Sequence, residues 1–280
     1  MKDLHSDGHF YSVKGIKLHY TENGRGKPIL LLHGLGGCSY DWRGCVDLLA
    51  GAGFRVLALD IKGAGLSDKP EKSNYSIKQI ADEIRSFVKG KGIGKTIFIG
   101  NSFGGVLSLQ IAMDDPELIG ALVLIDTICY KQDLPYYFDL FSIPWLPEQI
   151  IHILPTRTIL VKVLKSCYAN PDLLKEEEID QYLLEINREG RREALIETVR
   201  QLVPDNSEDF TNKIAKINIP TLIIWGDKDT AIPIEHAKKL NSEIKGSRLE
   251  IVANCGHTPN QEKPQEVCIL ITDFLNRLYK

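Results

Sequence analysis

Long hydrophobic runs are absent from this 280-residue sequence. The longest uninterrupted apolar stretches, 121–125 and 267–271, have five residues each, whereas a helix that crosses a membrane needs about 20. The N-terminal residues, MKDLHSDGHFYS, also lack the apolar stretch of a signal peptide. We therefore expect no membrane span and a cytoplasmic location.

Paired cysteines and a basic excess are missing as well. The six cysteines stand singly at positions 38, 45, 129, 167, 255 and 268, which favours free thiols in a reducing cytoplasm. The sequence has 34 Lys and Arg residues and 37 Asp and Glu residues, which gives a net charge of −3. We therefore expect no nucleic-acid partner. With 43% hydrophobic and 25% charged residues, the composition is that of a globular protein. The sequence carries no signal for an oligomeric state.

Short apolar runs alternate with amphipathic stretches along most of the chain, which is typical of a parallel sheet covered by helices. A hairpin at the sheet edge is expected from residues 10–13 and 17–21, and amphipathic helices are expected over 77–90 and from 264 onward. Nearly continuous apolar runs predict strands buried on both faces, and these lie at 29–32, 55–59, 96–99, 122–125, 222–225 and 248–252.

The alternation of strand and helix breaks between about 129 and 211. No strand is expected there, whereas helical periodicity is present over 179–186 and 194–202. We predict an all-helical cap at 129–211, inserted after the sixth strand and lying above the carboxyl edge of the sheet, where ligands bind in open α/β folds. Residues 1–128 and 212–280 then form the α/β core.

The clearest chemical motif spans residues 100–105, which read Gly-Asn-Ser-Phe-Gly-Gly between a predicted strand and a predicted helix. A Gly-x-Ser-x-Gly turn in this place is a nucleophile elbow. The abrupt turn forces Ser102 into a strained conformation, and glycines around it let the strand and the helix approach each other. We therefore expect an exposed, nucleophilic hydroxyl at Ser102.

A serine nucleophile needs a base, and the base needs an orienting acid. Downstream, one predicted strand runs into a turn that contains Asp227 and Asp229, and another ends before His257. Both turns lie at the same edge as Ser102, and the order Ser, Asp, His is that of hydrolases built on such sheets. His33 also ends a strand, but we expect it to shape a loop rather than to act as the base.

At nearly full length the sequence resembles the α/β-hydrolase superfamily, in the branch with a helical cap. The matching segments are His33-Gly34, the 60–67 stretch with its two glycines, the elbow, the 226–233 turn and Gly256-His257. The resemblance implies a mostly parallel eight-stranded sheet flanked by helices. It also implies that the acid is Asp229, with Asp126 and Asp227 as the alternatives.

The implied reaction is ester hydrolysis. Ser102 attacks an acyl carbon, His257 takes the proton, and Asp229 stabilises the imidazolium. By the geometry of the elbow one oxyanion donor is the backbone N–H of Phe103, and the resemblance adds the N–H of Leu35. Water then completes hydrolysis, so we expect no metal and no cofactor.

Several alternatives stay open. The elbow and Cys255-Gly256-His257 are similar to C–C hydrolases of aromatic ring cleavage, although Thr258 replaces their usual Trp. Those enzymes hold a substrate carboxylate with a cap arginine, whereas we expect the cap's arginines, 157, 188, 191 and 192, to be solvated. A non-catalytic receptor on the same fold is a third hypothesis. The glycine-rich segments at 34–37 and 90–94 lack the full spacing of nucleotide-binding loops.

The substrate can be predicted only by class. A small to medium, partly hydrophobic carboxylic ester fits the low net charge and the aromatic cap. An aromatic cluster in the cap could line the substrate pocket or form the core of the cap itself. The residues that we assign to the pocket are Asn101, Tyr136, Tyr137, Phe141 and Trp145.

Overall fold

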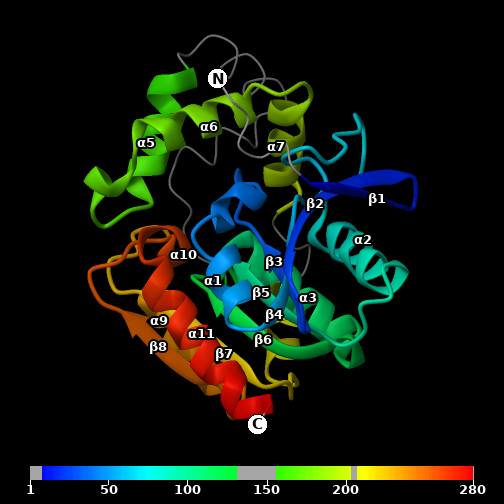
Figure 1. Cartoon of the computed structure of the whole chain (residues 1–280), viewed down its shortest axis with the longest axis vertical. Helices are drawn as coiled ribbons and strands as arrows, with labels where there is room; N and C mark the ends of the chain where they lie inside the picture. Colours follow the sequence, from blue (N-terminus) through cyan, green and yellow to red (C-terminus); the bar gives the residue numbers. More distant parts are fainter. Residues whose placement is uncertain (1–7, 131–155, 203–206, 280) are drawn as a thin grey trace.

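The computed structural model describes residues 8–130, 156–202 and 207–279, and its centre is one eight-stranded sheet (Figure 1). The strand order is β1-β2-β4-β3-β5-β6-β7-β8. The strands are β1 (His9–Val13), β2 (Ile16–Gly24), β3 (Lys27–Leu32), β4 (Phe54–Leu59), β5 (Thr96–Asn101), β6 (Ile119–Ile125), β7 (Thr221–Gly226) and β8 (Arg248–Val252).

The sheet is mostly parallel. Only the β1–β2 and β2–β4 pairs are antiparallel, which confirms the predicted hairpin at the sheet edge. From β4 to β8 every pair is parallel, and Leu32 of β3 is paired with Gly100 of β5, while Asn101 is paired with Ile125 of β6. The carboxyl ends of these strands therefore meet at one edge of the sheet.

Helices cover both faces of the sheet, as predicted. One face carries α1 (Val46–Gly51) and α11 (Pro264–Tyr279), whose apolar residues join one buried cluster. The opposite face carries four helices that share the other large cluster. These four are α2 (Ile77–Gly90), α3 (Phe103–Asp114), α8 (Ser207–Ile214) and α9 (Ile234–Glu243). The short helices are η1 (Ser39–Trp42), η2 (Pro116–Leu118) and α10 (Pro259–Glu262).

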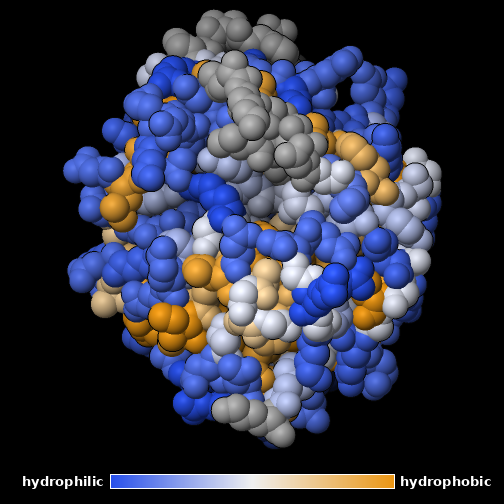
Figure 2. Space-filling model, in the orientation of Figure 1, coloured by the Kyte–Doolittle hydropathy of each residue, from blue (hydrophilic) through white to orange (hydrophobic). Residues whose placement is uncertain are grey.

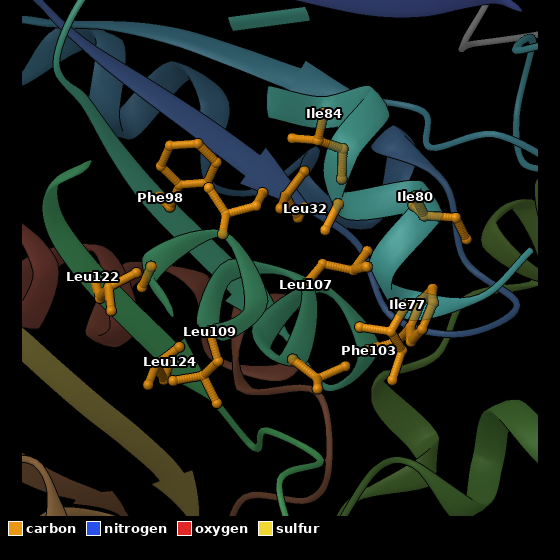
Figure 3. Close-up of a cluster of buried hydrophobic side chains, with 14 of the residues drawn as sticks. Leu32, Ile77, Ile80, Ile84, Phe98, Phe103, Leu107, Leu109, Leu122 and Leu124 are labelled. Carbon is orange, nitrogen blue, oxygen red and sulfur yellow. The ribbon is translucent and has the colours of Figure 1, made fainter. Parts of the chain in front are cut away.

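The core between α2, α3 and the sheet holds the elbow in place. Figure 3 shows Ile80 and Ile84 of α2, Leu107 of α3 and, from the strands, Leu32 and Phe98 in one buried cluster. All five side chains are at most 1% exposed, and each such burial contributes roughly 1.5–3 kcal/mol. The strand and the helix on either side of residue 102 are therefore rigidly held.

Between β6 and β7 the described residues form helices and no strand. The cap helices are α5 (Thr156–Ser166), α6 (Glu176–Ile186) and α7 (Arg191–Arg200), with a single 3-10 turn, η4 (Pro171–Leu173), between the first two. Figure 1 shows them above the carboxyl edge of the sheet, as expected. Residues 131–155 lie outside the described part, so the cap boundaries of 129 and 211 stay a prediction.

The cap is anchored to the core by a buried arginine. The guanidinium of Arg191 donates to the carbonyl oxygens of Gly63 (2.9 Å) and Gly37 (3.1 Å), which belong to two loops of the core. Beside it, Glu185 accepts the amide of Gly65 at 2.6 Å. Arg191 is only 3% exposed, so the expectation that it is solvated is wrong. A periodic sequence pattern reports which face of a helix is polar, not which polar groups a neighbouring loop will bond.

The outer surface carries both apolar and hydrophilic residues. Figure 2 shows apolar residues gathered over the lower part of one face, among hydrophilic ones. Within the described ranges, no helix combines the length and the apolar character that crossing a bilayer requires.

Replacing Arg191 with methionine tests the anchor. The change leaves two buried carbonyls without a donor, so we expect the free energy of unfolding to fall by about 1–3 kcal/mol in urea titrations. The matched control is Arg157→Met, because Arg157 is a cap arginine whose side chain is 45% exposed. Its loss should leave the free energy of unfolding nearly unchanged, because ion pairs of exposed side chains contribute little. Equal effects of the two changes would contradict the anchor.

Candidate active site

Ser102 occupies a strained turn between β5 and α3. Its φ of +52° lies in a region that costs a residue with a side chain about 1–3 kcal/mol. The surrounding backbone holds it there, because Ser102 N–H donates to the carbonyl of Ile125 at 2.8 Å. The predicted elbow geometry is therefore present at this position, but the expectation of an exposed hydroxyl is wrong, because Ser102 is only 5% exposed.

The glycines of the elbow are explained by contacts that leave no room for a side chain. A Cβ at Gly100 would lie 2.2 Å from the carbonyl oxygen of Gly104, and one at Gly104 would lie 2.1 Å from that of Leu32. A Cβ at Gly105 would lie 2.1 Å from Oγ1 of Thr127. The strand, the helix and the neighbouring strand ends thus pack around Ser102 without space for side chains at these three glycines.

Three polar side chains from three separate turns form one hydrogen-bonded series. Nε2 of His257 lies 3.0 Å from Oγ of Ser102, and Nδ1 of His257 lies 2.8 Å from Oδ2 of Asp229. A carboxylate can only accept, so Nδ1 carries the proton and Nε2 is left to accept the proton of the Ser102 hydroxyl. We call these residues the Ser–His–Asp series.

The acid of this series is held by more than the histidine. Oδ1 of Asp229 accepts the amides of Ala231 (2.7 Å) and Ile232 (3.0 Å), and its side chain is wholly buried. Burial alone would raise the pKa of Asp229, but the hydrogen bond and the charge of His257, the neighbouring Asp126 and the Ile232 amide together hold the pKa below its ordinary value. Asp229 is therefore the ionised partner of His257 at neutral pH.

Asp227, an alternative for the acid, and His33, an alternative for the base, contact other groups. Asp227 accepts the amide of Cys255 at 3.2 Å and makes no hydrogen bond to His257. His33 is buried, lies 2.8 Å from the carbonyl of Gly34 through Nδ1, and accepts the amide of Ile61 at Nε2. Burial lowers the pKa of His33, which keeps it neutral in this loop.

Asp126, the other alternative acid, lies beside the series but is not hydrogen-bonded to the histidine. It follows β6 with a φ of +41° and is fully buried. One oxygen of Asp126, one of Asp229 and one ring nitrogen of His257 lie within 4.8 Å of one another. Their chemistry could suit a metal, but the Asp229–His257 hydrogen bond already joins two of them, so we assign the group to proton transfer.

The two predicted oxyanion donors stay predictions. Phe103 is the first residue of α3, so its N–H has no partner within the helix. A Cβ at Gly34 would lie 3.5 Å from Cβ of Ser102, which places the loop that contains Leu35 beside the elbow. The amides of Phe103 and Leu35 thus belong to the two segments that flank the serine.

Sequence reasoning missed one residue that ties the cap to the histidine turn. The buried carboxylate of Glu262 accepts the amide of Gly256 (2.8 Å) and, from the cap, the amides of Ala169 (3.1 Å) and Asn170 (2.9 Å). His257 adds a bond of its own, since its amide donates to the carbonyl of Cys167 at 2.7 Å. No motif marks Glu262, whose partners are three backbone amides and the thiol of Cys255.

The predicted pocket is only partly within the described residues. Tyr136, Tyr137, Phe141 and Trp145 lie outside them. Asn101 is described, and its side-chain amide donates to the carbonyls of His257 (3.2 Å) and Ile125 (3.3 Å). This contact ties the histidine turn to the elbow, and a role in the pocket stays a prediction.

An open hollow of about 650 Å³ lies between the 67–72 loop and α7. Its lining is largely charged, with Asp68, Lys69, Glu193 and Arg200 among its residues, and it includes no member of the Ser–His–Asp series. We therefore do not place the reacting group of a substrate there.

The chain matches one protein family, described as alpha/beta hydrolase fold, over residues 27–152 and 177–264. It is 28% identical to a 2-hydroxy-6-oxo-6-(2'-aminophenyl)hexa-2,4-dienoic acid hydrolase of Metapseudomonas resinovorans, over 96% of this chain and 90% of that protein. It is also 28% identical to epoxide hydrolase 4 of Homo sapiens, over 93% of this chain and 76% of that protein.

A solved structure shares both the fold and part of the sequence. The crystal structure of a serine hydrolase involved in carbazole degradation superimposes with a TM-score of 0.81 at 26% identity, covering 96% of this chain and 98% of that one.

The role of Glu262 can be tested by Glu262→Gln. The amide turns an N–H toward backbone N–H groups, so we expect the free energy of unfolding to fall by about 1–3 kcal/mol. Because the histidine turn loses its support, turnover should fall about tenfold or more. Glu266→Gln is the control, since that side chain is 51% exposed. If urea unfolding and turnover respond equally to both changes, Glu262 does not link the cap to the histidine turn.

Proposed function

Because the chain belongs to the alpha/beta hydrolase fold family and is a hydrolase, we propose that it cleaves carboxylic esters through an acyl-enzyme on Ser102. The observation that carries the proposal is the Ser–His–Asp series, with 3.0 Å between Ser102 and His257 and 2.8 Å between His257 and Asp229. Its partners are a small to medium, partly hydrophobic ester and water.

The chemistry follows from the protons and charges of the series. Oγ of Ser102 attacks the acyl carbon while Nε2 of His257 takes its proton, and the ionised Asp229 stabilises the imidazolium. The oxyanion accepts from the amides of Leu35 and Phe103, each worth roughly 3–4 kcal/mol of barrier. The leaving alkoxide takes the proton from Nε2, and water then attacks the acyl-enzyme by the same route.

Epoxide opening, the reaction in the name of one relative, does not suit Ser102. Attack of a serine hydroxyl on an epoxide carbon would leave an alkyl ether, which has no carbonyl for water to attack. An ester formed on Ser102 does have such a carbonyl. The nucleophile therefore favours acyl transfer over epoxide hydrolysis.

Carbon–carbon cleavage is the second candidate, because one relative is named as a dienoic acid hydrolase of this type. In the resemblance, a cap arginine holds the substrate carboxylate. Here the guanidinium of Arg191 is already bonded to two backbone carbonyls, and Arg188 is paired with Glu185 at 2.7 Å. The position after the histidine is Thr258 rather than Trp. These contacts favour an uncharged ester over a carboxylated diketone.

A substrate panel tests the proposal. We expect p-nitrophenyl esters of short to medium acyl chains to turn over, with slower or no cleavage of a vinylogous 1,5-diketone. In Ser102→Ala the ester activity should fall by several orders of magnitude while circular dichroism shows an intact fold. Preferred cleavage of the diketone would reassign the substrate class, and full activity in Ser102→Ala would remove the serine mechanism.

The identity of the acid is tested by two identical substitutions in one turn. Asp229→Asn removes the charge that supports His257, so we expect kcat/KM to fall about 10⁴-fold. Among the described residues, the charge that Asp227→Asn removes contacts only the Cys255 amide and Lys228. We therefore expect kcat/KM to fall less than about tenfold in this variant. Kinetics with one p-nitrophenyl ester compares them, and a larger loss in Asp227→Asn would reassign the acid.

A further inference from the structure

A buried carboxyl group that the proposed reaction does not use lies next to the one that it does. Oδ1 of Asp126 accepts the amide of Gly226 at 3.1 Å. Its other oxygen, Oδ2, is buried and has no hydrogen-bond partner among the described residues as long as both aspartates are carboxylates. A buried anionic oxygen without a donor is costly, so this group calls for a different protonation state.

The surroundings decide which of the two carboxyl groups is charged. Asp229 has the His257 ring and two amides as donors, whereas among the described residues Asp126 has the Gly226 amide alone. Among the described residues, the other titratable groups near Asp126 are the His257 ring, whose Nδ1 proton is directed at Asp229, and the buried thiol of Cys255, which brings no positive charge. One oxygen of Asp126 and one of Asp229 lie within 4.8 Å of each other. Two carboxyl groups at this distance in a buried site do not both ionise. The negative charge therefore belongs on Asp229 and the proton on Asp126.

We propose that Asp126 is a neutral carboxylic acid that donates a hydrogen bond from Oδ2 to the Asp229 carboxylate and so positions Asp229 against His257. With its proton, Oδ2 becomes a donor and no longer lacks a partner. Burial, together with the charge of Asp229, raises the pKa of Asp126 well above its ordinary value. The role is one of positioning, and it deepens the proposed function, on which its kinetic consequences rest.

The arrangement gives the pair a single negative charge. A donor on Asp229 restrains the carboxylate from rotating away from Nδ1 of His257 and limits its basicity, so that the proton stays on the ring. The strained φ of Asp126 and the bond from Gly226 hold this donor in a fixed direction. Asp126 thus positions Asp229 as a neutral hydrogen-bond donor and does not itself act as the acid that orients His257.

The protonation state can be read without any substrate. Infrared difference spectra of the resting protein near pH 7, wild type minus Asp126→Asn, should contain the carbonyl band of a protonated carboxylic acid. Asp41 is another buried acid whose pKa is raised by burial, but its band cancels in this difference. Asp227→Asn, the same change in a partly exposed side chain, should leave the band in place. A difference spectrum without the band would overturn the proposal.

Kinetics then tests the positioning. Asp126→Ala removes a hydrogen bond to a charged group, so we expect kcat/KM for a p-nitrophenyl ester to fall about 10–100-fold. Asp126→Asn can donate and accept in the same directions, so it should restore the activity to within about fivefold of wild type. If Asp126→Asn is as impaired as Asp229→Asn, Asp126 acts through a charge, and the proposal is wrong.

Two further outcomes are informative. Should Asp126→Ala fail to fold, the infrared band and the activity of Asp126→Asn decide the question. Should no ester be turned over by the wild type, the proposed function fails, but the infrared band still shows whether Asp126 holds its proton. Failure of the Asp126 proposal is thus distinguishable from failure of the proposed ester hydrolysis.

Discussion

The hydrogen bond between Ser102 and His257 depends on one constraint, which is that parallel strands end at the same edge of a sheet. The two residues are 155 positions apart in the chain, yet their side chains lie 3.0 Å apart. They meet because β5 and β8 belong to one sheet and each ends in a turn at its carboxyl edge. The elbow adds the strained φ of Ser102, which only glycine neighbours such as Gly104 allow. Without that edge, the residues of this site would be unrelated polar side chains.

Burial then assigns different roles to groups of the same chemistry. Asp229 and Asp126 are both buried aspartates, but within the described part of the chain Asp229 has three donors and Asp126 has one amide. The cap contributes to this environment, because Glu262 joins its backbone to the histidine turn and Arg191 anchors it on loops of the core. The contacts that hold the cap on the core therefore also hold the histidine turn. We expect a change in the cap to alter the position of His257.

Much of this architecture could be predicted from the sequence because it depends on local patterns. Apolar runs marked the buried strands, and the order of the motif turns predicted that Ser102, Asp229 and His257 would share one edge. What could not be predicted depends on contacts between distant segments. Glu262 bonds backbone amides of two distant segments and the Cys255 thiol, and Arg191 is buried by loops that its own helix does not encode. The turn motifs alone left Asp126 and Asp227 as alternatives, since separating them requires the direction of each side chain.

The central claim is that Ser102 carries the acyl group during turnover. Rapid acid quenching of the enzyme during hydrolysis of a p-nitrophenyl ester, followed by mass spectrometry, tests it most directly. The intact protein should gain the mass of one acyl group, and peptide mapping should place that group on Ser102. Steady turnover with no acylated protein at any quench time, or an acyl group on another residue, would contradict the account.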